Sequence, residues 1–365
     1  MTLPKQKLSL ITSEFPPQPG GIGNHSYNLA IQLSDYYDVY VVTDNRSKVG
    51  NEEFVFDQKL PFGTKRLKQQ SFRVFMYVKR LFAIGKAIRS SKLVIASGKF
   101  SLWSVGFFSL FFKRRYIAIL HGSEVNFKSF LLRTSINLSL QRFDLLIAVS
   151  SFTKSLLKKQ SSPVVVIPNG HDPTKWKATT TPLVLKGYPK LITVGRISER
   201  KGQHRVIAYL PQLIKKYPNL HYHCVGIPTE TPNLLKLANE LDVFDHLTFH
   251  GSVSDQDLQS MLLSADIFVM LSKATSKGDV EGFGIAILEA NALGVPAIGF
   301  RGCGIEDAIN DGKSGLLISD DSEEELLRAI DLILSNYDDF RNHARDWSHA
   351  FEWRNVINHY LECLS

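Results

Sequence analysis

The stretch Leu191-Ile-Thr-Val-Gly-Arg-Ile-Ser-Glu-Arg-Lys-Gly-Gln203 passes from a short apolar run into a polar loop and then into a segment of helical periodicity. A strand followed by a helix is the repeating unit of parallel α/β sheets. The loop carries Arg196 and Lys201 at the carboxyl end of the expected strand, where such sheets bind ligands. We therefore expect an α/β domain that offers two cations to an anion. A pair of solvated surface charges would give the same sequence pattern.

Short apolar runs of the same kind recur on both sides of this stretch, with helical segments between them. The expected strands before it are Lys7–Ser13, Val39–Thr43, Leu93–Ala96, Tyr116–Leu120, Leu145–Val149 and Val164–Ile167. From this stretch onward they are Leu191–Val194, His221–Val225, Leu247–Phe249, Ile267–Leu271, Ala297–Phe300 and Leu316–Ile318. Such an alternation predicts parallel sheets with helices on both faces.

A break near residues 175–188, rich in Thr, Pro and Gly, separates the two series of strands. We predict two Rossmann-like, doubly wound parallel-sheet domains, at residues 1–175 and 176–349, that face a shared cleft. The final segment, residues 350–365, is expected to form a helix that crosses back onto the first domain.

The composition is that of an ordinary globular protein with 365 residues, of which 44% are hydrophobic and 21% charged. No secretory leader is apparent, and the longest apolar run, residues 101–112, is too short to span a bilayer. The three scattered cysteines fit reduced thiols better than a disulfide framework. A cytoplasmic protein is therefore expected.

The charge is distributed unevenly along the chain. Residues 1–170 contain 24 Lys and Arg against 9 Asp and Glu, whereas the remainder contains 19 against 26. A basic half beside an acidic half suggests that the first domain meets an anionic partner such as a membrane surface or nucleic acid. A contribution to solubility alone is the simpler interpretation.

A glycine-rich loop follows the first expected strand and opens a helix. It places Gly20, Gly21 and Gly23 where they leave room for a ligand, beside the unpaired N–H groups of a helix N-terminus. These glycines are predicted to contribute to donor binding. The signal is weak by itself, because glycines in a tight turn are as often structural.

Two glutamates, Glu281 and Glu289, flank the start of another expected helix. The residues after the first glutamate are Gly282, Phe283, Gly284 and Ile285, whose backbone N–H groups are predicted to approach a phosphate. Carboxylates beside phosphates are useful when they accept hydrogen bonds from sugar hydroxyls while nearby cations neutralise the phosphates. Each glutamate alone would more often be an N-terminal helix charge.

Polar residues also follow strands of the first domain. His121 directly follows the strand Tyr116–Leu120, where catalytic groups of open sheets lie. Glu14 and Glu124 are predicted as acceptor-side or secondary residues, and Glu124 is equally suited to cap a helix. Without further context, a hydrogen-bonded histidine at a strand end is the more common case.

Two other patterns imitate metal sites. Asp255-Gln-Asp257 resembles a metal-binding Asp-x-Asp, but it starts a helical pattern and is better explained by helix capping. The histidines lack the spacing of zinc ligands, and His221 and His223 lie on an expected strand. We predict neither a metal nor a cofactor.

Taken together, these motifs resemble the retaining nucleotide-sugar glycosyltransferases of family four, which have the two-domain GT-B fold. The resemblance covers almost the whole chain and rests on the Gly20-Gly21 loop, His121-Gly-Ser-Glu124, Ile167-Pro-Asn-Gly170, Gly195-Arg196 with Lys201-Gly202, and Glu281 with Glu289. It implies that Arg196 and Lys201 bind the donor diphosphate. It further implies that Glu281 contacts the transferred sugar, Glu289 binds the ribose hydroxyls and His121 acts near the breaking bond.

The expected function is metal-independent, retaining transfer of a hexose from GDP-mannose or a UDP-sugar. The expected acceptor is a lipid-linked glycan, in the synthesis of a cell-surface polysaccharide or glycolipid. A nucleotide-sugar epimerase or phosphorylase of the same fold remains an alternative, as does a non-enzymatic nucleotide or nucleic-acid binder. The last leaves the paired glutamates unexplained, and no nucleic-acid partner is expected.

The segment between Phe72 and Lys92 suggests how the first domain meets an anionic membrane. An apolar stripe is expected to pack inward: Val74, Tyr77, Val78, Leu81, Ile84 and Ile88. The outer face would combine Lys79 and Lys86 with Phe72, Phe75 and Phe82, a mixture typical of helices that lie in a headgroup layer. A second basic and aromatic cluster spans residues 107–115. Packing of these aromatics inside the domain is the competing interpretation.

Overall fold

The computed structural model describes residues 4–47, 50–68, 73–158, 160–177, 181–319 and 322–365. The chain divides into two compact units. The first unit consists of the residues up to Gly170 together with Trp353–Ser365. The second unit is His171–Glu352. Residues 178–180 of the expected interdomain break, and Phe72 of the expected membrane-facing helix, lie outside the described residues.

The first unit is built on a parallel sheet with the strand order β3-β2-β1-β4-β5-β6-β7 within the described residues. The strands are β1 (Lys7–Thr12), β2 (Asp38–Asp44), β3 (Gly63–Leu67), β4 (Leu93–Ser97), β5 (Arg115–Leu120), β6 (Leu145–Ala148) and β7 (Val164–Val166). The helices are α1 (Gly21–Leu33), α2 (Asn51–Asp57), α3 (Arg73–Ser90), α4 (Lys99–Phe108), α5 (Phe130–Leu140), α6 (Ser151–Ser155) and α13 (Trp353–Leu364).

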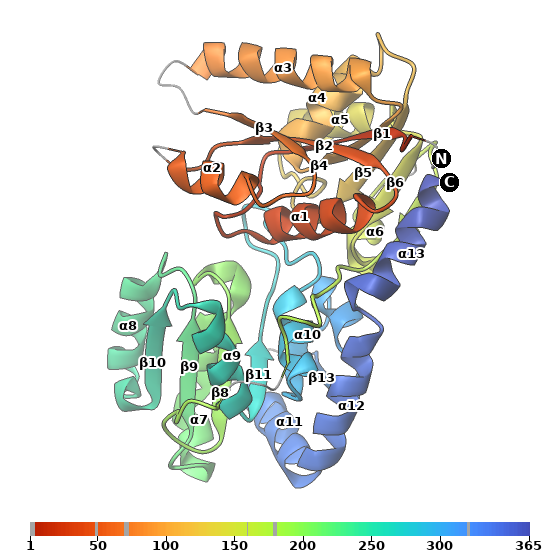
Figure 1. Ribbon diagram of the computed structural model, residues 1–365. Helices are drawn as coiled ribbons and strands as arrows, with labels where there is room; N and C mark the ends of the chain where they lie inside the picture. The colour runs from red at the N-terminus through yellow and green to blue at the C-terminus, as the bar shows by residue number, and fades with distance from the viewer. Residues whose placement is uncertain (1–3, 48–49, 69–72, 159, 178–180, 320–321) are drawn as a thin grey trace. The chain divides into compact units, whose positions relative to one another are not determined.

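Helices cover both faces of this sheet. Figure 1 shows α3, α4 and α5 over one face and α1 over the other. The central strand β4 is buried along its whole length, as expected for a parallel strand covered on both sides. The apolar run Leu93–Ala96 of the sequence therefore becomes a central strand because it can bury both of its faces.

The last helix, α13, belongs to the first unit and packs against α1. The ring Nε2 of His25 on α1 hydrogen-bonds the hydroxyl of Tyr360 at 3.0 Å, and both side chains are buried. Arg115 at the start of β5 donates to the carbonyl oxygens of Cys363 and Leu364 at 2.7 and 2.9 Å. These contacts fix the chain's final turn to the first unit.

The predicted inward stripe of α3 is wrong for its N-terminal half. Ile84 and Ile88 are buried, but Val74 and Val78 are 63% and 57% exposed. Tyr77 is also exposed, although its ring lies 5.3 Å from that of Phe100. The first half of α3 lies opposite the polar edge strand β3, which offers these side chains little apolar surface against which they could be buried.

The second unit repeats the architecture with the strand order β10-β9-β8-β11-β12-β13 in the part of the chain that is described. Its strands are β8 (Lys190–Val194), β9 (His221–Val225), β10 (Leu247–Gly251), β11 (Ile267–Met270), β12 (Ala297–Phe300) and β13 (Gly315–Ile318). Its helices are α7 (Gln203–Lys216), α8 (Thr231–Glu240), α9 (Asp255–Ser264), α10 (Ile285–Ala292), α11 (Glu323–Ser335) and α12 (Tyr337–His349), with short 3-10 turns at Glu199–Lys201, Phe244–His246 and Gly304–Ala308.

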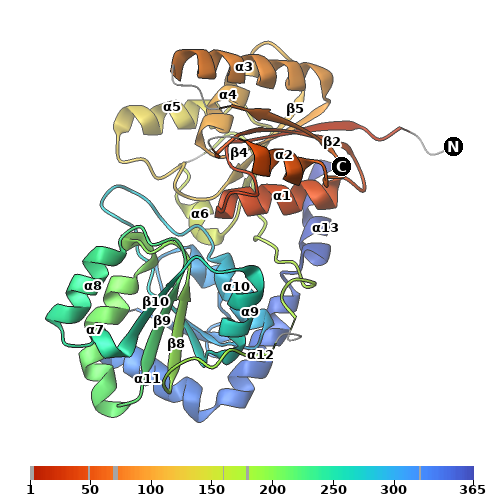
Figure 2. The same ribbon diagram turned by 60° about the vertical axis from the view of Figure 1, so that its left-hand side comes forward.

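The core of the second unit lies between the sheet and the helices α7, α8 and α11. Figure 2 shows these helices on one side of the strands and α9, α10 and α12 on the other. All strand pairs in both sheets are parallel. The predicted fold of two doubly wound parallel-sheet domains is thereby confirmed.

Candidate active site

The loop that leaves β8 is held in place by glycines and by one glutamine. Gly202 has a positive φ of 79°, and a Cβ there would lie 2.0 Å from the carbonyl oxygen of Leu271, so no larger residue fits. Gln203, the first residue of α7, donates to the carbonyl oxygen of Arg196 at 3.2 Å and accepts from the N–H of Ser198 at 3.3 Å. The loop therefore presents its cations from a defined backbone.

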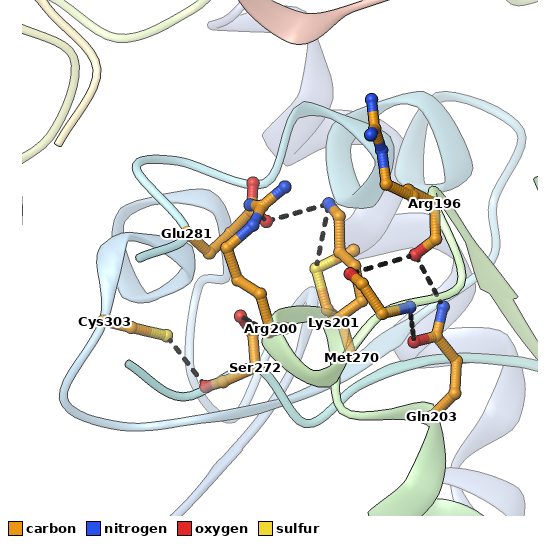
Figure 3. A network of polar contacts seen from close by, with 9 residues as sticks. Arg196, Arg200, Lys201, Gln203, Met270, Ser272, Glu281 and Cys303 are labelled. Carbon is orange, nitrogen blue, oxygen red and sulfur yellow. Dashed lines mark hydrogen bonds and ion pairs between the residues drawn. The ribbon is translucent and has the colours of Figure 1, made fainter. Parts of the chain in front are cut away.

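Lys201 and Arg200 converge on one carboxylate in this loop. The ammonium Nζ of Lys201 lies 2.9 Å from Oε2 of Glu281, and the guanidinium of Arg200 contacts the same oxygen (Figure 3). Lys201 and Glu281 are each 8% exposed, and the sulfur of Met270 lies 4.0 Å from Nζ. One carboxylate thus bridges two cations in a largely buried position.

Burial and pairing act in opposite directions on these groups. Burial raises the pKa of the Glu281 carboxyl, but Lys201 and Arg200 outweigh it and hold that pKa below its usual value. Burial lowers the pKa of the Lys201 ammonium despite the attraction of Glu281. A buried ion pair contributes little net stability, because desolvation offsets the attraction between the charges. Stability alone therefore does not explain why the cluster sits at the end of a parallel strand.

Arg196 behaves differently from its neighbours. Its side chain is exposed, and Figure 3 shows the guanidinium extending away from Glu281. Among the residues that the structure describes, none accepts a hydrogen bond or forms an ion pair with this guanidinium. The predicted diphosphate ligands are therefore in two states: Lys201 is already paired, whereas Arg196 has its donors free.

The residues before α10 form a compact turn. Gly284 caps the helix with a positive φ of 82°, and a Cβ there would lie 2.7 Å from the side chain of Ile305. A Cβ on Gly304 would lie 2.1 Å from the carbonyl oxygen of Gly282, so the two segments approach through their backbones. Phe283 is buried, with its ring 6.0 Å from that of Phe351. Phe283 therefore acts as a packing residue in this conformation.

Ile285 and Glu289 lie on α10 itself. Ile285 is the first residue of the helix, so its N–H belongs to the turn whose backbone donors lack helical partners. Glu289 lies one turn further and is half-buried. Burial raises the pKa of its carboxyl to about 7, although Lys175 and Lys201 oppose the shift. Near neutral pH this group is therefore present in both protonated and ionised forms.

His121 directly follows β5 in the first unit and is fixed by its neighbours. Its Nε2 lies 3.0 Å from the hydroxyl of Ser97, and its ring is edge-on to that of His25 with centroids 5.1 Å apart. Burial lowers the pKa of His121 to about 4. The imidazole is therefore neutral at pH 7 and offers a hydrogen bond to a ligand, not a positive charge.

Glu124 holds the turn that follows β5. Its Oε1 accepts a hydrogen bond from the backbone N–H of His121 at 2.6 Å, and the residue is 1% exposed. Burial raises the pKa of this carboxyl, while the backbone hydrogen bonds partly offset the increase. In this conformation Glu124 positions His121 and does not face solvent.

The glycine loop of the first unit divides into packing and open positions. A Cβ on Gly20 would lie 2.4 Å from Oε2 of Glu14, and one on Gly23 would lie 3.1 Å from the backbone nitrogen of Phe15. A Cβ on Gly21 would meet nothing within 4 Å. Glu14 is half-buried, with its carboxylate 3.7 Å from Arg46. Gly21 is therefore the position where the loop remains open to a ligand.

Two family profiles together match most of the sequence. The profile of Glycosyltransferase Family 4 matches residues 19–175, and that of Glycosyl transferases group 1 matches residues 177–350. The chain is a family-4-type glycosyltransferase. The resemblance predicted from the motifs is thereby confirmed.

Proteins similar to this glycosyltransferase include sugar transferases from several bacteria. It is 25% identical over 350 residues to the GDP-mannose-dependent alpha-(1-6)-phosphatidylinositol monomannoside mannosyltransferase of Mycolicibacterium smegmatis, covering 90% of this chain and 89% of that protein. It is 28% identical over 198 residues to the putative colanic acid biosynthesis glycosyltransferase WcaL of Escherichia coli, covering 52% and 47%.

The same fold occurs in solved structures. HepE from Anabaena, in complex with UDP and glucose, superposes with a TM-score of 0.79 at 19% identity, covering 98% of this chain and 99% of that one. This likeness confirms the GT-B fold of the glycosyltransferase.

The sequence did not identify several residues that surround Lys201 in the second unit and His121 in the first. Arg200 was visible next to Lys201, but nothing in the sequence separates it from a solvated charge. His25, Ser97 and Met270 come from elements far from the motifs they contact. Only the fold brings them to His121 and Lys201.

The two patterns that imitate metal sites have other roles in the structure. The hydroxyl of Ser254 caps α9 by accepting from the N–H of Asp257, and Asp255 pairs with Lys175 at 2.9 Å. These aspartates therefore belong to the first turn of a capped helix. Among the described residues, no group of three or more His, Cys, Asp or Glu side chains is arranged to hold a metal ion.

The histidines of β9 form a buried, neutral cluster. Nδ1 of His223 lies 3.0 Å from Nε2 of His250, and Nε2 of His221 lies 2.8 Å from the hydroxyl of Thr248. Burial lowers the pKa of both His221 and His223 to about 4. Their contacts thus depend on the uncharged imidazoles.

This cluster predicts that the second unit loses stability between pH 6.5 and pH 4. Unfolded histidines bind protons below a pKa of about 6.5, whereas the folded ones resist protonation. The stability is therefore fully present above pH 6.5 and falls as the pH drops, by about 2 kcal/mol at pH 5 for His223. Denaturant unfolding at pH 5 and pH 7.5 measures the difference.

A matched pair of variants isolates the cause of this pH dependence. His223→Asn is expected to make the free energy of unfolding less dependent on pH, even if it lowers stability at pH 7.5. His343→Asn, at an exposed site on α12, should leave the dependence unchanged. An unaltered slope in His223→Asn would show that other groups cause the loss.

Proposed function

We propose that this glycosyltransferase moves a hexose from a nucleotide-diphosphate sugar, with retention at the anomeric carbon, to a lipid-linked glycan. The product would belong to a cell-surface polysaccharide or glycolipid. The observation that carries the proposal is the cluster of Lys201, Arg200 and Glu281 at the end of β8, beside the N-terminus of α10. It combines cations, a carboxylate and the N-terminus of a helix within one small region.

The proposed donor site assigns a different part of the donor to each group. Arg196 and Lys201, with the N–H groups at the start of α10, bind the diphosphate, because phosphate oxygens match guanidinium and helix N-terminal donors. Glu281 accepts hydrogen bonds from the hydroxyls of the transferred hexose. Glu289 binds the ribose hydroxyls, for which a carboxyl group serves in either protonation state.

Donor binding in this site requires a rearrangement of ion pairs. Lys201 is paired with Glu281 in the structure, so the diphosphate competes with Glu281 for the ammonium. Arg200 also holds Glu281, which leaves that carboxylate with a partner when Lys201 turns to the phosphate. The exposed guanidinium of Arg196 needs no exchange and is suited to the first contact.

In the first unit, we assign catalysis to His121 and loop contacts to Gly21. The neutral imidazole, supported by Ser97 and by the turn that Glu124 holds, donates a hydrogen bond where charge develops as the glycosidic bond breaks. Glu14 remains a candidate for acceptor contact because its carboxylate is half-exposed. Gly20 and Gly23 contribute by letting the loop pack closely.

The donor base and sugar follow from the relatives only as a proposal. The mycobacterial relative is named for GDP-mannose, whereas the Anabaena structure contains UDP and glucose. The higher sequence identity, 25% against 19%, favours GDP-mannose as the first donor to test. A UDP-sugar is the second.

The proposed place of action is a cytoplasmic membrane face, where the protein associates peripherally. Among the described residues, no helix is both long and apolar enough to cross a bilayer. The helices α3, α4 and α5, which share one face of the first unit (Figure 1), carry large exposed apolar side chains. On the helices they are Val74, Phe75, Tyr77, Val78, Phe82, Phe107, Phe130, Leu131, Leu132 and Leu138, and Leu110 and Phe111 follow just after the end of α4. Such a concentration is typical of a membrane or protein contact surface.

The test is an assay of sugar transfer from GDP-mannose or UDP-glucose to a membrane lipid extract. The released GDP or UDP is measured. We expect activity with one donor to persist in excess EDTA, because Arg196, Lys201 and the α10 N-terminus supply the positive charge that a metal would otherwise provide. Activity that disappears with EDTA and returns with magnesium or manganese would contradict metal independence. A failure of both donors to react or to bind would contradict the proposed function itself.

A further inference from the structure

The first unit contains a groove of about 1000 Å³ between α3 and the free edge of its sheet. Strands β2 and β3 form one wall and α3 forms the other. It lies at the upper end of the roughly 300–1,000 Å³ range of small-molecule sites. All of its lining residues belong to the first unit, and none of them is a residue to which the donor or catalytic site is assigned above.

The groove exists because α3 is held at one end only. Ile84 and Ile88 are buried against the sheet, whereas Val78 and Phe82 are 57% and 76% exposed. The edge strand β3 reads Gly-Thr-Lys-Arg-Leu and offers little apolar surface under the first half of the helix. A gap between helix and strand is the result.

The walls of the groove are apolar, and its rim is strongly basic. Val39, Tyr40 and Leu67 line it from the strands, and Val78, Phe82 and Ala83 line it from α3. The rim carries Lys7, Lys65, Lys68, Lys79 and Lys86, all exposed. Within the described residues, none of these five ammonium groups has a hydrogen-bond or ion-pair partner, and Asp38 is the single acidic side chain that lines the groove.

We propose that this groove binds one acyl chain of an anionic membrane lipid, with the rim lysines around its headgroup. The apolar walls and the volume suit a hydrocarbon chain, and the unpaired lysines match a negatively charged head and not a neutral one. The inference rests on the proposed membrane association but goes beyond it, because a flat contact between exposed helices and a bilayer needs no groove. Nucleic acid fits less well, because most of the apolar lining is aliphatic and Tyr40 and Phe82 are the two aromatic side chains of the lining that could stack on bases.

The probe for this site is an undecanoic acid that carries a dansyl group, used below its micellar concentration. Its fluorescence rises when the chain leaves water, so a titration gives affinity and stoichiometry without a bilayer. We expect saturable binding of one probe per chain. Ala83→Trp, which fills the groove from α3, and Lys65→Glu/Lys86→Glu, which reverses charge at the rim, should each weaken binding by at least tenfold.

Two controls separate the groove from the exposed helical surface. Phe111→Ser, on the exposed apolar surface and outside the groove lining, should bind the probe as the wild type does. Thermal unfolding of each variant checks its fold, and the surface charge reversal keeps the test valid if Ala83→Trp is unstable. An equally strong competition by neutral dodecyl maltoside would overturn the role of the lysines.

Co-sedimentation with vesicles of phosphatidylglycerol and phosphatidylcholine distinguishes this inference from the proposed membrane association. If anionic vesicles recover the wild type but the probe binds both groove variants unchanged, the groove inference is wrong and the membrane proposal stands. If the probe binds in the groove but no vesicle recovers the protein, a membrane lipid is not its occupant. Transfer activity tests neither outcome and remains an independent measurement.

Discussion

Replacing Glu281 with glutamine is expected to lower kcat by about 100- to 1,000-fold, the loss found when a single preorganised hydrogen-bonding group that stabilises a transition state is removed. The amide keeps the size of the side chain but removes the negative charge that Lys201 and Arg200 share. Donor affinity should stay the same or rise, because the two cations no longer have a carboxylate that competes with the diphosphate. A fall in kcat without a rise in KM is therefore the expected signature.

The measurement combines steady-state transfer with calorimetric titration of the donor. Glu199→Gln is a matched control, since Glu199 lies on the same loop but is exposed. Glu199→Gln should change neither kcat nor KM. If Glu281→Gln turned over as fast as the wild type, the contact between Glu281 and the transferred hexose would be excluded.

The sequence was sufficient for the fold because the decisive strands are buried on both faces. Runs such as Leu93–Ala96 have no polar residue to interrupt them, so each had to be a central parallel strand. The strand β3 was not predicted. Its sequence, Gly63 to Leu67, is mostly polar and lacks an apolar alternation, and only pairing with β2 makes it a strand.

The error in α3 has a related cause. Helical periodicity identifies which residues share a face, but it does not say how far the neighbouring apolar surface extends. Val74 and Val78 share a stripe with buried Ile84 and Ile88, yet they lie where the polar edge of the sheet offers nothing to cover them. The exposure of the first turns of α3 therefore depends on the edge strand β3, which the sequence did not predict.

The candidate site was predictable where chemistry and position coincide in one motif. Arg196 and Lys201 follow a strand directly, and Glu281 precedes a helix, so the local sequence assigned all three to the ends of elements, where parallel sheets bind ligands. The pairing of Lys201 with Glu281 was not predictable, because the residues are 80 positions apart and meet only through the order of the strands. The neutral state of His121 likewise depends on burial by the folded unit.

Replacing Lys201 with alanine is expected to weaken donor binding by about 10- to 100-fold. A hydrogen bond to a charged group contributes about 1.5–3 kcal/mol, and each 1.4 kcal/mol corresponds to a tenfold change in Kd. The substitution also leaves Glu281 with Arg200 as its remaining partner among the two cations, so a modest fall in Tm is expected. Burial then raises the pKa of Glu281 with less opposition, so this carboxyl takes up its proton at a higher pH than in the wild type.

Calorimetric titration with the donor gives the affinity of this variant directly. The matched control is Lys236→Ala on α8, whose side chain is 79% exposed and forms an ion pair with Glu240 on the same helix. It should bind donor as the wild type does. Because Lys201 contacts the donor in its ground state, its loss should raise Kd and KM together, in contrast to the kcat effect at Glu281. Wild-type donor affinity in Lys201→Ala would show that the diphosphate is held by other groups, and Arg196 with the N-terminus of α10 would then have to bind it without the buried lysine.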